Sequence, residues 1–266
     1  MAPRVSAVIG VYNNAATLQR AIDSLLAQTL AELELIVIDD GSRDDSPQIA
    51  RAAAAKDRRV RAVALGENVG ISRSLNQALA LARAPVVAIQ DADDYSEPAR
   101  LERQLAALDA DPDLAVVGCR MREVDEQGHE LAPRTRFAAG DVRGVLLHFN
   151  PIPNTSAAMR RDWVLAAGGY DPRYRYAMEH DLWLRLAEHH GIGALDEVLA
   201  TRTMGSTNVA ARAERAQLAE TIRARASALV RRRTLRGAGG MLVPAISYVA
   251  PLALKRRRRR QIGQAP

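Results

Sequence analysis

The sequence predicts an α/β protein built on a mainly parallel central sheet flanked by helices, with a basic helical tail. Two observations carry this prediction. Short apolar runs alternate with segments of helical period from residue 5 to residue 110, and an arginine-rich helical pattern begins at residue 209. Such alternation is typical of right-handed βαβ units, in which each helix connects two parallel strands. We therefore expect an α/β domain over residues 1–208 and a tail over residues 209–266.

The expected strands are short runs of aliphatic and β-branched residues that end in polar turns. The run Leu114–Cys119 contains the single cysteine, which excludes an internal disulfide and for which we expect a buried packing role. A shorter strand is expected over residues 156–159. The strands of the alternating region are Val5–Val11, Leu33–Ile38, Val60–Leu65 and Pro85–Ile89.

The expected helices carry apolar residues three and four positions apart. Pro47 suits the first turn of the helix that starts at Ser46, since its missing N–H has no partner there. Beyond residue 120 the alternation weakens, and we expect a polar hairpin around Gln127 and Gly128. The expected helices follow Asn14, begin at Ser46, follow Gly70, and cover Leu101–Leu108, Asp141–Phe149, Asp181–Ala187 and 210–235.

Charge is distributed unevenly along the chain. From residue 209 onward there are 14 Lys and Arg against 2 Asp and Glu, whereas the preceding residues hold 23 against 29. The apolar segment 241–254 contains two prolines and is shorter than the ~20 residues that a membrane-spanning helix needs. With the cationic run Lys255–Arg260 behind it, this segment favours attachment to an anionic membrane surface.

The N-terminal residues run directly into a strand pattern without the apolar core of a signal peptide. We therefore expect a cytoplasmic protein, peripheral on the inner face of the cell membrane. The tail contains one aromatic residue, Tyr248, so stacking on nucleic-acid bases has little support. We expect no specific nucleic-acid partner.

Three carboxylates, Asp91, Asp93 and Asp94, follow a predicted buried strand at once. Ligands bind at the carboxyl ends of strands in open α/β sheets, and carboxylate oxygens suit Mg²⁺ or Mn²⁺. A second acidic strand end lies at Asp39 and Asp40. The chain has neither a dinucleotide-binding fingerprint nor a P-loop, so a diphosphate bound here would need a cation as its counter-charge.

Five segments carry strand-end and helix motifs in a fixed order along the chain, namely Val8–Asn13, Leu35–Ser42, Glu67–Asn76, Asp91–Asp94 and Glu179–Arg185. Taken in this order, they resemble the family 2 glycosyltransferases. The resemblance covers about residues 3–208 and implies the GT-A fold of nucleotide-diphospho-sugar transferases. It also implies inverting transfer of a sugar from a UDP- or dTDP-type donor to a hydroxyl of a glycan or lipid-linked acceptor, with Mg²⁺ or Mn²⁺ as cofactor.

The resemblance assigns donor-binding roles to several residues. Tyr12 resembles the residue beside the nucleotide base, and Asp40 resembles the carboxylate that hydrogen-bonds the pyrimidine. Arg73 lies near the family's nucleotide contacts, and Arg202 matches an arginine that reaches the phosphates. Each has a plainer alternative. Tyr12 could close the core, Asp40 could cap a turn, and the two arginines could be solvated.

The same resemblance identifies Asp91 and Asp93 with the family's D-x-D pair. Asp93 is then the direct metal ligand, and Asp91 the partner of the ribose or of a metal-bound water. Asp94 is expected only to cap the following helix.

Inverting displacement needs a carboxylate base, and the resemblance offers Glu179 and Asp181. Relatives often carry Glu where Met178 stands here, which leaves the choice open, with Glu179 preferred. The alternative is that both acids only stabilise a helix N-terminus. In that case the chain would be a catalytically silent GT-A scaffold or a nucleotide-binding protein.

Overall fold

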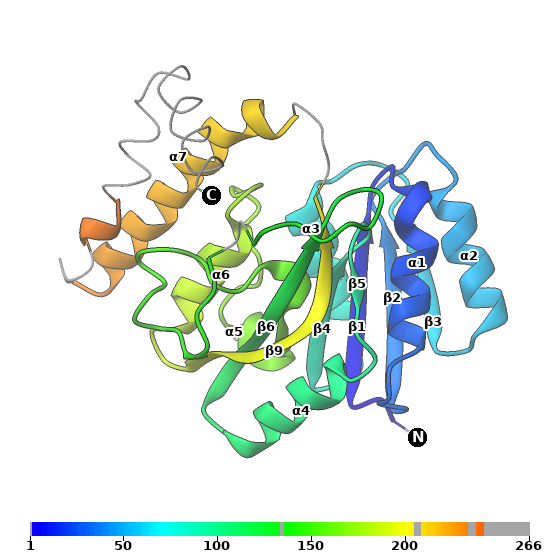
Figure 1. The fold of residues 1–266 in the computed structure, drawn as a ribbon, viewed down its shortest axis with the longest axis horizontal. Coiled ribbons are helices and arrows are strands. Elements are labelled where there is room, and N and C mark those ends of the chain that lie inside the picture. The colour runs from blue at the N-terminus through cyan, green and yellow to red at the C-terminus, as the bar shows by residue number, and fades with distance from the viewer. Residues whose placement is uncertain (1, 134–135, 205–208, 234–237, 242–266) are drawn as a thin grey trace.

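The computed structural model describes residues 2–133, 136–204, 209–233 and 238–241. In this part of the chain the centre of the molecule is a nine-stranded sheet, ordered β3-β2-β1-β4-β8-β6-β9-β5, with β7 paired to β9 (Figure 1). The mostly parallel central sheet flanked by helices confirms the predicted fold class. The strands are β1 (Val5–Val11), β2 (Leu33–Asp39), β3 (Val60–Ala64), β4 (Val86–Asp91), β5 (Tyr95–Ser96), β6 (Leu114–Val124), β7 (Gly140–Asp141), β8 (Ala158–Arg160) and β9 (Gly191–Thr203).

Helices connect the strands and cover both faces of the sheet. The pattern of apolar residues predicted the helices between the first strands within a few residues of their ends. A short 3₁₀ helix, η1 (Asn154–Ser156), precedes β8, and another, η2 (Ala238–Met241), follows the last α-helix. The α-helices are α1 (Ala15–Leu26), α2 (Ser46–Lys56), α3 (Ile71–Leu81), α4 (Arg100–Ala110), α5 (Arg161–Ala166), α6 (Met178–Leu186) and α7 (Val209–Arg231).

The topology of the parallel strands creates a natural ligand position. β1 pairs in parallel with β2 on one side and with β4 on the other, so the chain reverses its direction of progress across the sheet at this point. Gly10 is in register with Asp91, and Val11 with Asp39. Open α/β sheets bind ligands outside the carboxyl ends of strands at such a switch point.

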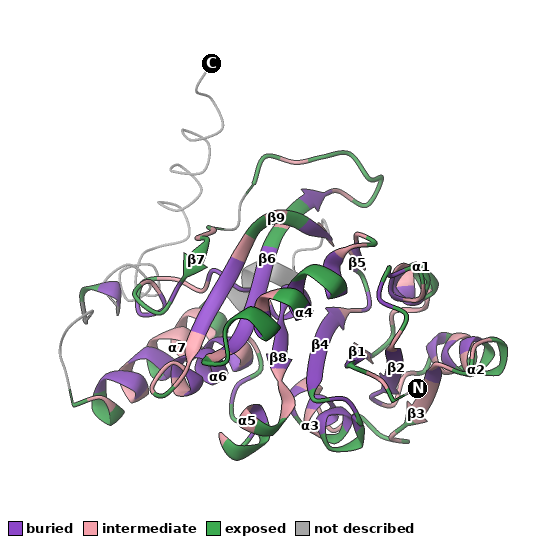
Figure 2. Ribbon diagram, turned by 90° about the horizontal axis from the view of Figure 1, so that it is seen from below, coloured by how far each residue is buried: buried purple, intermediate pink, exposed green. Residues whose placement is uncertain are grey.

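The two faces of the sheet bury different sets of apolar side chains. Val8 and Ile36 belong to the core that packs against α3 and α6, whereas Ile9 and Leu35 belong to the core beneath α1, α2 and α4. Consecutive residues of a strand point to opposite faces, so both faces must be apolar when helices cover both. Figure 2 shows the resulting buried strands at the centre of the molecule.

One predicted helix is wrong. Residues 141–149 begin in β7 and continue as a series of turns, in which Val145 N–H donates to Val142 O and His148 N–H donates to Val145 O. Gly140 and Asp141 pair with β9, which fixes the start of this segment in an extended conformation. Gly144 further lowers the helix propensity of the segment. Burial of Val142 and Leu146 against α6 outweighs the helical spacing.

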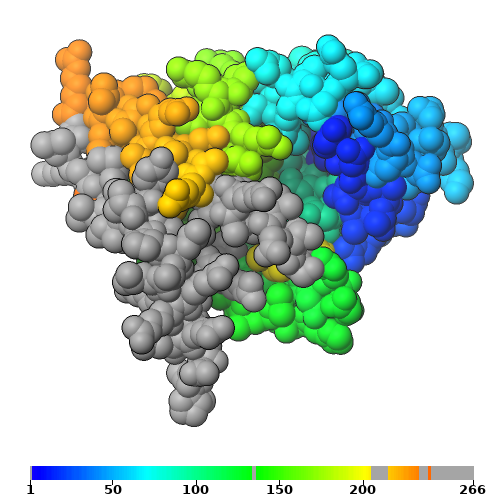
Figure 3. Space-filling model, turned by 90° about the horizontal axis from the view of Figure 1, so that it is seen from above, coloured from blue at the N-terminus to red at the C-terminus, as the bar shows by residue number. Residues whose placement is uncertain are grey.

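The tail begins with a helix that shares the main core. Ala224, Ala228 and Leu229 of α7 are buried in the same cluster as Trp183 of α6. Figure 3 shows the yellow-to-orange surface of α7 beside the yellow-green surface of the preceding segments. The division at residue 208 stays a prediction, and residues 242–266 lie outside the described part. Among the described helices, none combines the length and apolarity needed to cross a bilayer.

Candidate active site

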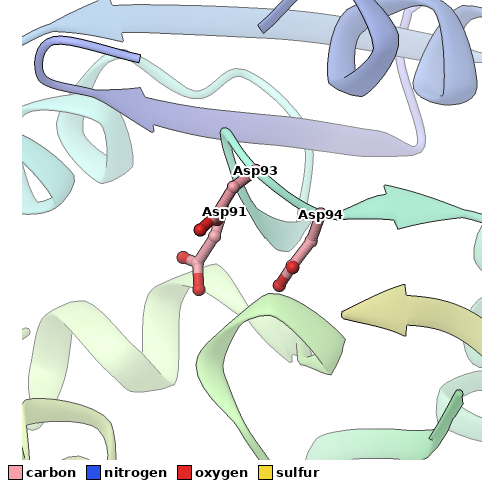
Figure 4. A group of neighbouring side chains, drawn as sticks. All are labelled: Asp91, Asp93 and Asp94. Carbon is pink, nitrogen blue, oxygen red and sulfur yellow. The ribbon is translucent and has the colours of Figure 1, made fainter. Parts of the chain in front are cut away.

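The site is built around the turn between β4 and β5. Asp91 is the last residue of β4, and Asp93 and Asp94 follow before β5 begins. Figure 4 shows the three carboxylates directed into one space. One oxygen from each lies within 4.8 Å of the others, close enough to share a single divalent cation. Such a set of hard oxygen donors fits Mg²⁺ or Mn²⁺ and fits soft-metal chemistry poorly.

The electrostatics of this cluster also suit a cation. Burial raises the pKa of Asp91 to about 6, and the Asp93 carboxylate adds to the shift. Burial, together with the charges of Asp91 and Asp93, raises the pKa of Asp94 well above its usual range. Within the described residues none of the three forms an ion pair with Lys or Arg at contact distance. The Arg202 guanidinium lowers the pKa of both Asp91 and Asp94 without neutralising the cluster.

Asp94 does not cap the following helix, contrary to prediction. Its Oδ1 accepts a hydrogen bond of 3.0 Å from the Thr203 N–H at the end of β9, whereas α4 begins at Arg100 with Ala99 as its N-cap. Asp94 is 2% exposed. The long-range bond to β9 turns the Asp94 carboxylate into the cluster, so the structure gathers three acids where the family resemblance assigned two to the metal.

An arginine from the first helix supports the acidic turn from outside. Arg20 donates to Asp93 O at 3.0 Å and to the Thr203 hydroxyl at 2.9 Å, and its guanidinium stacks on the Tyr95 ring. This ties the β4–β5 turn to the end of β9. Nothing in the local sequence around Arg20 indicated this role, because the contacts span 73 and 183 residues.

The two predicted base residues have different surroundings. Glu179 is partly buried and accepts a hydrogen bond of 3.0 Å from the Asn150 amide. Burial raises the pKa of Glu179 to about 7, and the nearby Asp91 carboxylate contributes. Glu179 therefore lies within electrostatic reach of the acidic cluster, although it comes from α6, 88 residues further along the chain. Asn150 was not singled out from the sequence.

Asp181, in contrast, is engaged inside its own helix. Its side chain is 4% exposed and forms an ion pair of 2.8 Å with Arg185, one turn later. Arg185 also donates to the carbonyls of Ala167 and Gly169, which closes the turn after α5. Through Arg185, Asp181 therefore helps to stabilise the turn that follows α5.

A pocket of about 490 Å³ opens beside the cluster at the carboxyl ends of β1 and β2. Tyr12, Asp40 and Arg73 all contribute to its lining. Tyr12 is 48% exposed, so its ring is free to meet a ligand. The lining also includes Pro172, Tyr174, Arg175 and Tyr176. Gly10 lines this pocket and is in register with Asp91, which makes the pocket and the acidic cluster neighbours across the switch point.

Asp40 is held in place by the turn before α3. Its two oxygens accept hydrogen bonds from Val69 N–H at 2.8 Å and Gly70 N–H at 3.0 Å. Gly41 permits this approach, because it has φ +76° and a Cβ there would lie 2.5 Å from the Glu67 carbonyl carbon. Each Asp40 oxygen keeps a second lone pair for a ligand.

A larger cavity of about 630 Å³ lies at the opposite, amino-terminal end of the strands. Two of the three acidic residues that line it are paired with arginine. The buried Glu34 binds Arg83 at 2.7 Å, and Asp57 binds Arg59 at 2.8 Å. This cavity therefore lacks a cluster of unpaired carboxylates like that of Asp91, Asp93 and Asp94, and size alone does not make it the active site.

With this geometry in place, comparison with known proteins identifies the family. The family model for glycosyl transferase family 2 matches residues 6–166. This range includes the acidic turn and the pocket-lining residues between Gly10 and Arg73. This chain belongs to glycosyl transferase family 2. The glycosyltransferase is 30% identical over 207 residues to the amylovoran biosynthesis glycosyltransferase AmsE of Erwinia amylovora, and the alignment covers 77% of each chain.

Two solved structures share the fold. One is residues 1–349 of Staphylococcus aureus TarS in complex with UDP-GlcNAc, with a TM-score of 0.74, 18% identity, and coverage of 92% of this glycosyltransferase and 73% of that chain. The other is the mannosyltransferase PcManGT of Pyrobaculum calidifontis in complex with GDP-Man and Mn²⁺. Its TM-score is 0.67 at 22% identity, with coverage of 99% and 80%. These similarities confirm the GT-A architecture predicted from the motifs.

Proposed function

We propose that this glycosyltransferase moves a sugar, with inversion, from a nucleotide-diphosphate donor to an acceptor hydroxyl and uses Mg²⁺ or Mn²⁺. The observation that carries the proposal is the meeting of two features at one sheet edge. A carboxylate cluster that fits a divalent cation lies beside a pocket lined by an exposed aromatic ring and a held carboxylate. Relatives that bind UDP-GlcNAc, or GDP-Man with Mn²⁺, support this reading.

The roles of the donor-binding residues follow from their chemistry. Tyr12 offers a ring face for the base, Asp40 offers acceptors for a pyrimidine N–H, and Arg73 adds positive charge at the rim. These groups favour a UDP- or dTDP-type donor. Asp91, Asp93 and Asp94 would hold the cation, which when bound supplies Lewis acidity toward the departing diphosphate.

Glu179 is the base that this arrangement supports best. A carboxylate with a pKa of about 7 is ionised in much of the population at neutral pH and still basic enough to take a proton from an acceptor hydroxyl. The Asn150 amide orients it by donating to one oxygen. The buried ion pair of Asp181 with Arg185 argues against a catalytic role for Asp181.

The first test concerns the metal site. Asp93→Ala should abolish Mn²⁺-dependent binding of a nucleoside diphosphate, measured by calorimetry. Asp162→Ala is a matched control, because the Asp162 side chain is 83% exposed on α5 and far along the chain from the cluster. Unchanged affinity in Asp93→Ala would refute the metal role.

A second test separates the two base candidates. Glu179→Gln should keep donor binding and lose most turnover, about 10²–10⁴-fold, which is the usual contribution of general-base catalysis. Asp181→Asn should lower the stability of the fold, because the ion pair with Arg185 is lost. The fraction of the variant that is folded should keep the turnover number of the wild type. A dead Asp181→Asn beside an active Glu179→Gln would reverse the assignment.

The alternative is a catalytically silent GT-A scaffold. It is based on Met178, which stands where relatives often carry an acid. Release of nucleoside diphosphate from a panel of nucleotide sugars distinguishes it from an enzyme. We further propose a glycan or lipid-linked acceptor, as the amylovoran and succinoglycan biosynthesis proteins among the relatives suggest. A site on the inner face of the membrane would bring such an acceptor to the enzyme.

A further inference from the structure

A single carboxylate on α7 holds the segment that precedes α6. Glu220 Oε2 accepts hydrogen bonds from three successive backbone N–H groups, those of Arg175 at 2.9 Å, Tyr176 at 2.6 Å and Ala177 at 3.0 Å. Hydrogen bonds from backbone N–H groups to an ionised carboxylate are about twice as strong as those between neutral groups. The contact bridges 43 to 45 residues of sequence and joins the tail helix to the active-site side of the molecule.

The start of α6 needs such a partner. The first N–H groups of a helix have no acceptor within the helix, and Ser, Thr, Asp or Asn at the N-cap normally supplies one. The N-cap of α6 is Ala177, which has no side-chain acceptor. Glu220 instead accepts from the N–H of this N-cap residue and of the two residues before it, and its negative charge suits the positive end of the helix dipole.

The residues held by Glu220 connect two parts of the active site. Tyr174, Arg175 and Tyr176 line the 490 Å³ pocket. Directly after them begins α6, of which Glu179 is the second residue. Further bonds hold this segment between two helices. The Ser72 hydroxyl of α3 donates to Tyr174 O at 2.9 Å, and the Tyr174 side chain hydrogen-bonds Ser227 of α7.

We propose that Glu220 is a positioning residue that fixes the segment leading into α6 and thereby aims Glu179 at the acceptor. The inference rests on the proposed function, since it presumes that Glu179 is the base. It assigns α7, which lies beyond the residues matched by the family description, a direct part in assembling the active site. A misplacement of about 1 Å in a reacting group can cost about 10²-fold in rate.

The contact itself is tested without reference to activity. In Glu220→Ala, hydrogen exchange of the amides of Arg175, Tyr176 and Ala177 should accelerate at least about tenfold, because their acceptor is gone. Exchange in the body of the sheet should not change. Unaltered protection of the three amides in this variant would overturn the inference.

The kinetic test measures where the loss falls. Glu220→Ala should lower kcat about tenfold and change KM for the nucleotide sugar less than about threefold, since Tyr12, Asp40 and Arg73 remain in place to bind the donor. Glu220→Gln retains a carbonyl oxygen that can accept at the same place, so it should recover most of kcat. An effect confined to KM would overturn the role of Glu220 in aiming the base.

Glu188→Gln is the matched control. Glu188 also anchors α7, through an ion pair of 2.6 Å with Arg231, but it follows α6 and does not touch the helix N-terminus. Its kcat should stay within about twofold of the wild type. An equal loss in Glu188→Gln and Glu220→Ala would reduce Glu220 to a general anchor. An inactive wild-type chain would overturn the proposed function, whereas an active wild type with an equally active Glu220→Ala would overturn only this inference.

Discussion

Asp91 illustrates the cost of bringing carboxylates together at the end of a buried strand. Its pKa is raised to about 6 by burial and by Asp93, so its ionised form is less favourable in the folded chain than in the unfolded chain. The stability that such a group contributes is fully present below its unfolded pKa and is lost as pH rises through the folded value. Above pH 6 the metal-free acidic cluster therefore destabilises the fold.

Asp91→Asn should accordingly raise the stability of the metal-free protein at pH 7.5, where the wild-type carboxylate is ionised. After allowance for solvent screening we expect about 1 kcal/mol, or about 2–4 °C in Tm. The gain should vanish near pH 4, and Mn²⁺ should stabilise the variant much less than the wild type. Thermal unfolding at both pH values, with and without Mn²⁺, measures this; a destabilised variant at pH 7.5 would contradict it.

Glu179 sets the expected pH dependence of turnover. The base must be unprotonated, so kcat should fall as pH drops through its pKa of about 7. A cation bound beside Asp91 would lower this pKa. The acidic limb of the pH profile, over which kcat falls, should therefore lie at or below pH 7. The limb should be absent from the residual activity of Glu179→Gln. A pH profile of kcat at saturating donor and acceptor checks both expectations, and an identical limb in the variant would point to another group.

His180 gives a separate prediction for acid stability. It is 3% exposed, its Nε2 lies 2.7 Å from Leu146 O, and burial lowers its pKa to about 4. The neutral ring contributes stability fully above the unfolded pKa of about 6.5, and this is lost as pH falls toward 4, because the unfolded chain takes up the proton first. Chemical denaturation from pH 7.5 to 4.5 should show a shallower loss of unfolding free energy for His180→Gln than for the wild type. Parallel curves would contradict this.

At the scale of elements, α7 acts as part of the folded body. Ala224 and Ala228 are fully buried against the core that contains Trp183, and only small side chains let the helices approach this closely. The sequence showed a basic helix but not what its apolar positions meet. Because Glu220 and Arg231 also join α7 to the body, removal of this helix would leave both a core surface and the start of α6 without partners.

Ala228→Asp should therefore destabilise the protein strongly, by about 3 kcal/mol or more, since it buries a carboxylate without a partner. Val230→Asp is the matched control, two residues away on the same helix and 77% exposed; it should change stability by less than about 0.5 kcal/mol. Urea unfolding of both variants measures the difference. Equal stability would mean that α7 is not part of the cooperative unit.

At the scale of the whole molecule, the charge asymmetry suggests how the enzyme meets its acceptor. Lys255 and the five arginines that follow it lie in residues 242–266, outside the described structure. Each such charge near an anionic surface contributes about 1 kcal/mol of attraction, which salt screens. Residues 1–208, which carry a net negative charge, would remain free to bind the donor.

A chain truncated after Met241 should lose binding to vesicles that contain anionic lipid, while it keeps its fold and its affinity for the donor. Full-length protein should bind these vesicles in low salt and release them in high salt. Vesicles of neutral lipid serve as the control for the charge dependence. Equal sedimentation of both chains with anionic vesicles would rule out the cationic tail as the membrane contact.

The order of elements was readable in the sequence because strand and helix periods are local. The apolar runs at Val5–Val11 and Leu33–Ile38 predicted parallel strands, and the acids after residue 90 marked a ligand edge. Residues 141–149 had helical spacing too, but their pairing with β9 and burial against α6 decided otherwise. Local pattern fails where a distant element supplies the stronger interaction.

By itself, the sequence determined the α/β architecture, the family and the position of Asp91, Asp93 and Glu179 along the chain. Only the tertiary structure brought Glu179 within electrostatic reach of Asp91, turned Asp94 into the acidic cluster through Thr203, and set Glu220 against the segment that leads into α6. The physical reason is distance along the chain. Periodicity and strand-end chemistry act over a few residues, whereas hydrogen bonds and charge coupling between elements 40 to 110 residues apart exist only after the chain has folded.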